Sequence, residues 1–266
     1  MVTATTRPPA VAGTFYPASP TALARMVDGF LDDAHARADE PSPKAIIVPH
    51  AGYVYSGAVA GRAWARFRRD AETIQRVVIL GPAHRVFVHG VVSPGVGRMQ
   101  TPLGTVEVDN DAIAQVRALH DDPEAHALEH SLEVQLPFLL HVVPKAKVVP
   151  LAIGRATTEE VARILDALWG GAETRVVVSS DLSHYLPYES ARELDSDTAE
   201  HIVKMDGILP PARACGYTGV NALIHVARRR RLDVKLYDLC NSGDTAGDPD
   251  AVVGYGAFGF YEAEAS

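Results

Sequence analysis

Short runs of β-branched residues alternate along this chain with longer segments of helical periodicity, and this alternation restricts the fold more than any other feature. Alternating strands and helices build a sheet with helices on both faces. We therefore predict a three-layer α/β fold with a mostly parallel central sheet. The predicted strands are 45–48, 76–80, 90–93, 147–153, 175–178, 234–237 and 252–260. The predicted helices are 19–36, 56–69, 109–119, 130–142, 157–169, 187–206 and 217–230.

The composition is that of a globular enzyme-sized domain. The chain has 266 residues, of which 47% are hydrophobic, and this is enough to form a sizeable core. No linker-like segment or shift in composition divides it, so we expect residues 1–266 to form a single domain. The formal net charge of -8 argues against nucleic acid as a partner, because binding to phosphates depends on clustered Lys and Arg.

The sequence also bears on the compartment. No apolar stretch approaches the roughly 20 residues that a membrane-spanning helix needs, and residues 1–17 lack the basic and apolar regions of a signal peptide. We therefore expect a cytoplasmic protein without a membrane partner. Cys215 and Cys240 are the only cysteines, too few for a disulfide framework, so we expect both thiols to be reduced.

Two of the predicted strands lead directly into a histidine. Residues 45–48 are followed by Pro49 and His50. Residues 76–80 are followed by Gly-Pro-Ala and then His84. In open α/β sheets, ligands bind in the crevice outside the carboxyl ends of the strands. Titratable side chains at this point of neighbouring strands therefore indicate a functional site.

Two further segments add polar residues to this pattern. The predicted strand 175–178 leads into Asp181 and His184, which would face the same side if a helical turn began there. His130 and Glu133 stand one turn apart at the predicted start of a helix, where Glu133 could instead form a capping box. A single residue of this kind is more often structural, but repetition at several strand ends favours a function.

Imidazoles beside a carboxylate or a thiolate form a site of intermediate softness, which suits Fe(II), zinc or copper. Two histidines and one anionic ligand with open positions fit non-haem Fe(II) chemistry with O2. Zinc in the same place would polarise a water molecule for hydrolysis. The residue types alone leave both chemistries open.

Taken together, these motifs resemble those of the Memo family, which includes the bacterial proteins called AmmeMemoRadiSam system protein B. The matching segments occur in the family's order from near the N-terminus to the last predicted strand. They are Arg7-Pro-Pro-Ala-Val-Ala-Gly-Thr-Phe-Tyr-Pro17, Pro49-His-Ala-Gly-Tyr-Val-Tyr-Ser-Gly57, Gly81-Pro-Ala-His84, Glu129-His-Ser-Leu-Glu-Val-Gln-Leu-Pro137, Ser179-Ser-Asp-Leu-Ser-His184 and Cys215-Gly216.

The resemblance implies a fold similar to that of the class III extradiol dioxygenases, which use non-haem Fe(II) to open catechol rings with O2. It implies that His50 and His84 are metal ligands. It also implies that Asp181 orients an imidazole in the same pocket and that His184 or His130 handles protons. Relatives are often encoded beside a radical-SAM protein and an AMMECR-type protein, which implies that these proteins share a modification pathway.

The third metal ligand is where this sequence departs from the family pattern. Animal Memo proteins place a cysteine before the final strand, and the matching stretch here contains both Cys240 and Asp244. Asp244 would complete a two-histidine, one-carboxylate set suited to Fe(II). Cys240 would make the site softer and favour copper or thiolate-bound iron. We interpret Cys215 as a small buried residue ahead of a helix.

We predict an Fe(II)-dependent, dioxygenase-like oxidoreductase acting on an unidentified small molecule or peptide, with copper or zinc as alternative metals. Tyr16 and Tyr53 are predicted to wall the pocket around an aromatic substrate, or else to pack against the sheet. Two alternative functions are a non-catalytic module that binds a metal or a peptide, and a zinc-dependent hydrolase.

Overall fold

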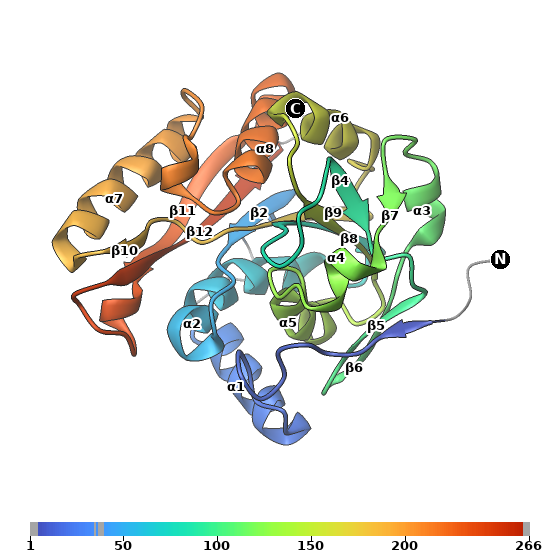
Figure 1. Cartoon of the computed structure of the whole chain (residues 1–266), viewed down its shortest axis with the longest axis horizontal. Coiled ribbons are helices and arrows are strands. Elements are labelled where there is room, and N and C mark those ends of the chain that lie inside the picture. Colours follow the sequence, from blue (N-terminus) through green and yellow to red (C-terminus); the bar gives the residue numbers. More distant parts are fainter. Residues whose placement is uncertain (1–4, 35, 37–39, 263–266) are drawn as a thin grey trace.

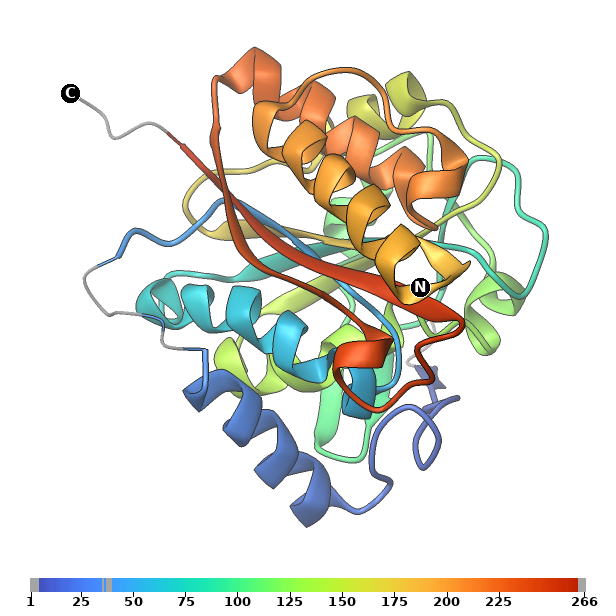
Figure 2. The same cartoon turned by 90° about the vertical axis from the view of Figure 1, so that its left-hand side faces the viewer.

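The structure is a computed structural model, and it describes residues 5–34, 36 and 40–262. Among them, a nine-stranded sheet runs through the molecule with helices on both of its faces (Figures 1 and 2). The predicted three-layer α/β architecture is therefore confirmed.

Four strands at the centre of the sheet run parallel to one another. Their order is β2 (Ala45–Val48), β9 (Thr174–Ser179), β3 (Arg76–Pro82) and β8 (Lys147–Ile153). Every residue of β2 and β9 is buried, as expected of Val- and Ile-rich strands that are covered by helices on both faces. The carboxyl ends of β2, β9 and β3 consequently lie side by side.

Antiparallel strands extend the sheet on both sides of this centre. Beyond β8 lies β4 (Val91–Ser93), which pairs with β7 (His120–Asp121). On the other side, β12 (Val252–Tyr261) runs antiparallel to β2 and pairs with both β11 (Asp233–Asn241) and β10 (His184–Leu186). The parallel pairing predicted from the sequence is thus concentrated in the middle of the sheet.

Helices cover both faces of the sheet, as Figure 2 shows. One layer contains α6 (Thr158–Ala167), α7 (Tyr188–Lys204) and α8 (Tyr217–Arg230). The other contains α1 (Pro20–Asp32), α2 (Tyr53–Trp64) and α5 (Leu136–Val142). Local signals fix several of their ends, such as the capping box that Thr157 and Glu160 form at the start of α6.

Several elements differ from the sequence prediction. The predicted helix 109–119 is only α3 (Asn110–Ala114), and α4 (Pro123–Ala127) was not predicted. The predicted helix 130–142 begins with a 3-10 turn, η2 (Glu133–Gln135), before α5. The remaining 3-10 turns are η1 (Ala65–Asp70), η3 (Pro211–Arg213) and η4 (Ser242–Asp244).

A small second sheet was also missed. It consists of β1 (Thr6–Arg7), β5 (Arg98–Thr101) and β6 (Gly104–Glu107). In the β5–β6 hairpin, alternate residues such as Met99 and Val106 are buried and their neighbours exposed. These strands are only two to four residues long, and Pro102 and Gly104 interrupt the hairpin, so its strand character was weak in the sequence.

A buried carboxylate attaches the N-terminal segment to the body of the protein. Glu133 forms a 2.5 Å ion pair with the guanidinium of Arg7 and accepts hydrogen bonds from the Ala10 and Val11 backbone amides and from the Tyr16 hydroxyl. Arg7 donates further hydrogen bonds to two backbone carbonyls. Glu133 therefore orders the N-terminal segment and is not part of a pair with His130.

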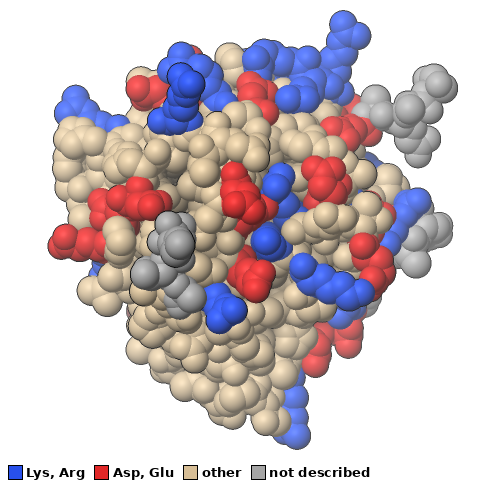
Figure 3. Space-filling view, turned by 90° about the vertical axis from the view of Figure 1, so that its right-hand side faces the viewer, with Lys and Arg blue, Asp and Glu red and all other residues tan. Residues whose placement is uncertain are grey.

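The charged surface shows no dominant sign on the face seen in Figure 3, where acidic and basic side chains are interspersed. Among the described residues, no helix combines the length and the apolarity needed to cross a bilayer. The absence of a nucleic-acid partner stays a prediction from net charge.

We expect Glu133→Gln to lower the free energy of unfolding by about 3 kcal/mol, because it leaves the buried guanidinium of Arg7 without its counter-ion. Urea unfolding followed by circular dichroism measures this change. The control is Glu72→Gln, which removes an exposed ion pair with Lys145 and should leave stability nearly unchanged. Equal stability of both variants would contradict the anchoring role.

Candidate metal centre

The candidate site lies at the carboxyl ends of three consecutive central strands. His50 follows β2, Asp181 follows β9 and His84 follows β3. Strand β9 lies between the two histidine-bearing strands, so they are next-nearest rather than direct neighbours. The parallel pairing brings all three loops to the same edge, where binding sites of open α/β sheets occur.

Three histidines form the core of the site. The imidazoles of His50, His84 and His130 each offer a nitrogen, and these nitrogens all lie within 4.8 Å of one another. The rings of His84 and His130 are stacked with their centroids 4.8 Å apart, and the ring of His50 meets both edge-on. These three side chains could hold a metal ion.

The hydrogen bonds around His50 fix which of its nitrogens is free. Its Nδ1 lies 3.0 Å from the Ser179 hydroxyl, and that hydroxyl donates its proton to the Ser131 carbonyl at 2.6 Å. Ser179 can then only accept from His50, so Nδ1 carries the proton. The Nε2 atom of His50 is left with a lone pair for a ligand.

Two buried side chains support Ser179 in turn. The amide of Gln135 donates to the Ser179 hydroxyl and to the Pro49 carbonyl, and its oxygen accepts from the Trp64 indole. These bonds use the donors and the acceptor of Gln135 together, so its orientation is determined. The network therefore holds both the ring of His50 and the turn that precedes it.

Glu129 fixes the orientation of the His84 ring, as Ser179 does for His50. Its carboxylate accepts from the His84 backbone amide at 2.5 Å and lies 3.1 Å from Nδ1 of the same residue. The backbone amide of Ser131 donates to it as well, at 2.8 Å. A carboxylate beside Nδ1 places the imidazole proton there, and Nε2 of His84 is again the free nitrogen.

His130 differs from the other two imidazoles. Its Nδ1 is buried and has no hydrogen-bond partner among the described residues, and the nearest carboxylate oxygen, Oε1 of Glu129, is 3.4 Å away. One face of the ring packs against Phe15, with centroids 4.7 Å apart. A buried ring nitrogen without a partner is available to a metal or to a proton in transit.

Cys215 also belongs to the site, which the sequence interpretation missed. Its Sγ lies 3.3 Å from Nε2 of His50 and accepts a hydrogen bond from the Asp181 backbone amide. The approach depends on Gly216, because a Cβ at that position would lie 2.7 Å from Cβ of Ser180. The Cys-Gly pair ahead of a helix was the available signal, but the sequence does not show which strand end it reaches.

Burial sets the charges of the site. It lowers the pKa of His50 to about 3 and that of His130 to about 4, with additional repulsion among the imidazoles. Burial and the nearby Asp181 raise the pKa of the Cys215 thiol to about 12. Burial opposes ionisation of Glu129, but hydrogen bonds from His84 and Ser131 hold its pKa at about 2. At neutral pH the buried imidazoles are therefore neutral.

An open cavity of about 960 Å³ leads to these residues. Aromatic side chains at its edge include Phe15, Tyr55 and Tyr185. Tyr185 is 76% exposed and has a φ of 58°, which is a strained conformation for a residue other than glycine. The cavity can accommodate a small organic molecule beside the histidines.

Asp181 and His184 line this cavity, but not on a helical turn. His184 begins strand β10, and its Nδ1 lies 2.8 Å from the Leu182 carbonyl. Asp181 is buried and accepts a hydrogen bond from the His50 backbone amide, while burial raises the pKa of its carboxyl group. Asp181 therefore positions the residue that the sequence analysis assigned as a ligand.

The other predicted site residues lie elsewhere. Asp244 accepts hydrogen bonds from the Tyr188 hydroxyl and the Asn241 backbone amide, and it lines a separate cavity together with Cys240. Neither belongs to the histidine cluster. Tyr16 and Tyr53 are buried in the core, where their hydroxyls donate to Glu133 and to the Val134 carbonyl, and they do not line the cavity.

Comparisons with known proteins find relatives along nearly the whole chain. The family model described as Memo-like protein matches residues 7–258. A MEMO1 family protein of Archaeoglobus fulgidus is 36% identical to this chain, covering 96% of it and 99% of the relative. A MEMO1 family protein of Caldivirga maquilingensis is 33% identical (97% and 99% covered), and one of Aquifex aeolicus is 34% identical (94% and 97%).

We expect the chelator-treated protein to lose stability as the pH falls from about 6.5 toward 3. The unfolded chain binds a proton at each histidine near pH 6.5, whereas buried His50 binds one only near pH 3, so acid favours unfolding across this window. In His50→Gln the slope of the unfolding free energy against pH should decrease by the contribution of about one proton across this window. Parallel curves for the two proteins would contradict the neutral, buried state of His50.

Proposed function

Because the chain belongs to the Memo-like protein family, we propose that its histidine cluster holds a redox-active metal and that the protein is a non-haem iron oxidoreductase acting on a small molecule. The observation that carries this proposal is the pair of anchored imidazoles whose Nε2 atoms are left free, with the Cys215 thiol 3.3 Å from Nε2 of His50. Such a donor set is a ready metal site.

We assign His50, His84 and Cys215 as the ligands. In a tetrahedral site with a metal–nitrogen distance of about 2.0 Å and a metal–sulfur distance of about 2.3 Å, the two donor atoms are about 3.5 Å apart. Nε2 of His50 and Sγ of Cys215 are 3.3 Å apart, which is close to this spacing. A bound cation would stabilise the thiolate, which burial otherwise disfavours.

This assignment replaces Asp244 and Cys240 as candidates for the third ligand. Two imidazoles and one thiolate suit Fe(II), with copper and zinc as alternatives. Bound Fe(II) would supply one-electron chemistry with O2 at the open positions. The side chains around the metal would position the ligands, bind the substrate and transfer protons.

The protein side chains have distinct roles in this proposal. His130 is neutral at pH 7 and accepts a proton at its unpaired Nδ1. His184 is a second proton carrier on the same cavity, and Asp181 holds the backbone at His50. Phe15 and Tyr55 provide flat apolar walls, which favour an aromatic substrate.

We also propose a cellular compartment and a pathway for the reaction. The free thiols of Cys215 and Cys240 suit the reducing cytosol. A radical-SAM protein and an AMMECR-type protein are the partners we propose for a shared pathway. Co-purification with these two proteins tests this link.

We expect protein purified without oxygen to bind about one Fe(II) per chain, and His50→Ala, His84→Ala and Cys215→Ala each to lose most of it. Iron content measured by mass spectrometry of the protein fraction checks this. Cys240→Ala and Asp244→Asn are matched controls outside the cluster and should retain the metal. Retention in Cys215→Ala with loss in His130→Ala would instead make His130 the third ligand.

Turnover separates an enzyme from a binding module. We expect the iron-loaded protein to consume O2 with a member of a catechol panel, and His130→Gln to keep its iron while O2 uptake falls about 100-fold, as is typical of a lost acid/base group. An oxygen electrode gives the rate. No uptake with any catechol, despite a full iron site, would favour metal or peptide binding. Ester or amide hydrolysis restored by zinc alone would favour the hydrolase.

A further inference from the structure

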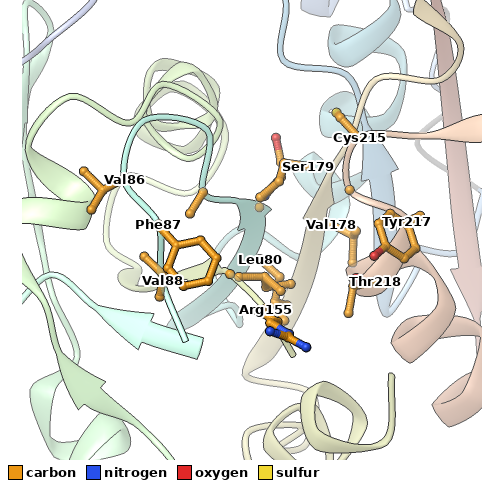
Figure 4. A pocket seen from close by; sticks show the side chains of 17 residues that line it. Leu80, Val86, Phe87, Val88, Arg155, Val178, Ser179, Cys215, Tyr217 and Thr218 are labelled. Atoms are coloured by element: carbon orange, nitrogen blue, oxygen red, sulfur yellow. The ribbon is translucent and has the colours of Figure 1, made fainter. Parts of the chain in front are cut away.

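Another cavity, of about 220 Å³, lies beyond Cys215, and Cys215 lines both this cavity and the one at the histidines. It is bounded by the segment that carries Val86, Phe87 and Val88 on one side and by the start of α8 on the other (Figure 4). In this view, Ser179 and Cys215 lie at one end and Arg155 at the other. Cys215, a proposed ligand, and Ser179, which supports His50, thus lie at one end of this cavity.

The cavity has a single formal charge on its lining. Arg155 is the only charged residue among the lining residues, which include no Asp or Glu. Its guanidinium is exposed and forms no ion pair with any residue that the structure describes. A cation at the end of an otherwise uncharged cavity favours an anionic group.

Two further donors point to the same kind of group. The hydroxyl of Thr218 has no hydrogen-bond partner within the described chain, although the residue is only 8% exposed and lines the cavity. Thr218 stands in the first turn of α8 (Tyr217–Arg230), a helix of 14 residues whose N-cap, Gly216, provides no side-chain cap and whose first turn holds no acidic residue. Helix N-termini attract anions through their free amides and dipole.

The rest of the lining is apolar. Leu80, Ile153 and Val178 form the floor at the carboxyl ends of the central strands, and Val88 closes one side. Phe87 is 73% exposed beside the cavity. The floor residues are at most 6% exposed, so a ligand with an apolar body would contact them and cover the exposed ring of Phe87, whereas a bare inorganic anion would leave that ring in water.

We propose that this cavity binds a small carboxylate with a branched or flat apolar body. The carboxylate contacts Arg155 and Thr218, and the body extends toward Cys215. On the proposed metal function, on which this part rests, the cavity holds the non-reacting end of the substrate and directs the other end to the metal centre.

Calorimetric titration of chelator-treated protein with isovalerate tests the binding step without any metal. Isovaleramide has the same shape without the charge, and inorganic phosphate has charge without the apolar body. Arg155→Gln and Thr218→Val remove the donors with little change in volume. Arg163→Gln, on an exposed position of α6, is the matched control for the loss of one positive charge.

We expect saturable binding of isovalerate, with isovaleramide and phosphate about tenfold weaker or worse. Arg155→Gln and Thr218→Val should each weaken isovalerate binding about fivefold, and Arg163→Gln should leave it unchanged. Absent binding, equal affinity for the amide, or no effect of either cavity variant would overturn the proposal.

A second measurement tests the link to the metal centre. In protein shown to contain Fe(II), the methyl protons of bound isovalerate should relax faster than in the chelator-treated protein, because they lie at the Cys215 end. Unchanged relaxation in iron-containing protein would overturn the substrate assignment. Failure of the metal proposal would appear separately, as absent iron with isovalerate binding intact.

Discussion

The parallel pairing of β9 between β2 and β3 is the constraint on which the site depends. In this register Val48 lies beside Ser179, and Leu80 beside Val178. The strands therefore end at the same level, about 4.8 Å apart from one to the next. The loops that carry His50, Asp181 and His84 therefore all begin at the same edge of the sheet.

The segment from Glu129 to Gln135 then determines how these loops are oriented. Glu129 holds His84, the Ser131 carbonyl and Gln135 hold Ser179, and Ser179 holds His50. Each of these groups is buried, so an unmade hydrogen bond would be costly, and each is paired. His130, in the middle of the segment, is the exception, since its Nδ1 has no partner in the described chain. The hydrogen bonds therefore hold the proposed ligands His50 and His84 in place. They leave Nδ1 of His130 without a partner, and this is the atom at which we propose that a proton is transferred.

The sequence predicted the parts of this arrangement that depend on local pattern. Hydrophobic runs predicted that strands end just before His50 and His84. The rule that ligands bind at the carboxyl ends of strands in open α/β sheets predicted the general position of the site. The motif at 129–137 placed His130 close by only through its resemblance to a family. Asp181 and His184 reach the same cavity, although by a strand rather than a helical turn.

The parts that were missed depend on contacts between distant segments. Cys215 meets His50 across 165 positions, and no local pattern encodes that distance. For Glu133 the sequence left open a pair with His130 or a capping box, but its partners Arg7 and Tyr16 lie more than a hundred positions away. Tyr16 and Tyr53 carry aromatic rings in matched motifs, yet burial in the core gives them a structural role. The residue types indicated which side chains could bind a metal or transfer a proton. Only the tertiary packing showed which of them lie in the same site.

In the proposed site, imidazoles anchored at Nδ1 present their Nε2 atoms to one metal ion. Crystals grown and loaded with Fe(II) without oxygen test it through an anomalous-scattering map at the iron edge. We expect one peak about 2.0 to 2.3 Å from Nε2 of both His50 and His84. A peak bound through Nδ1, or one located at Asp244 and Cys240 instead, would contradict it.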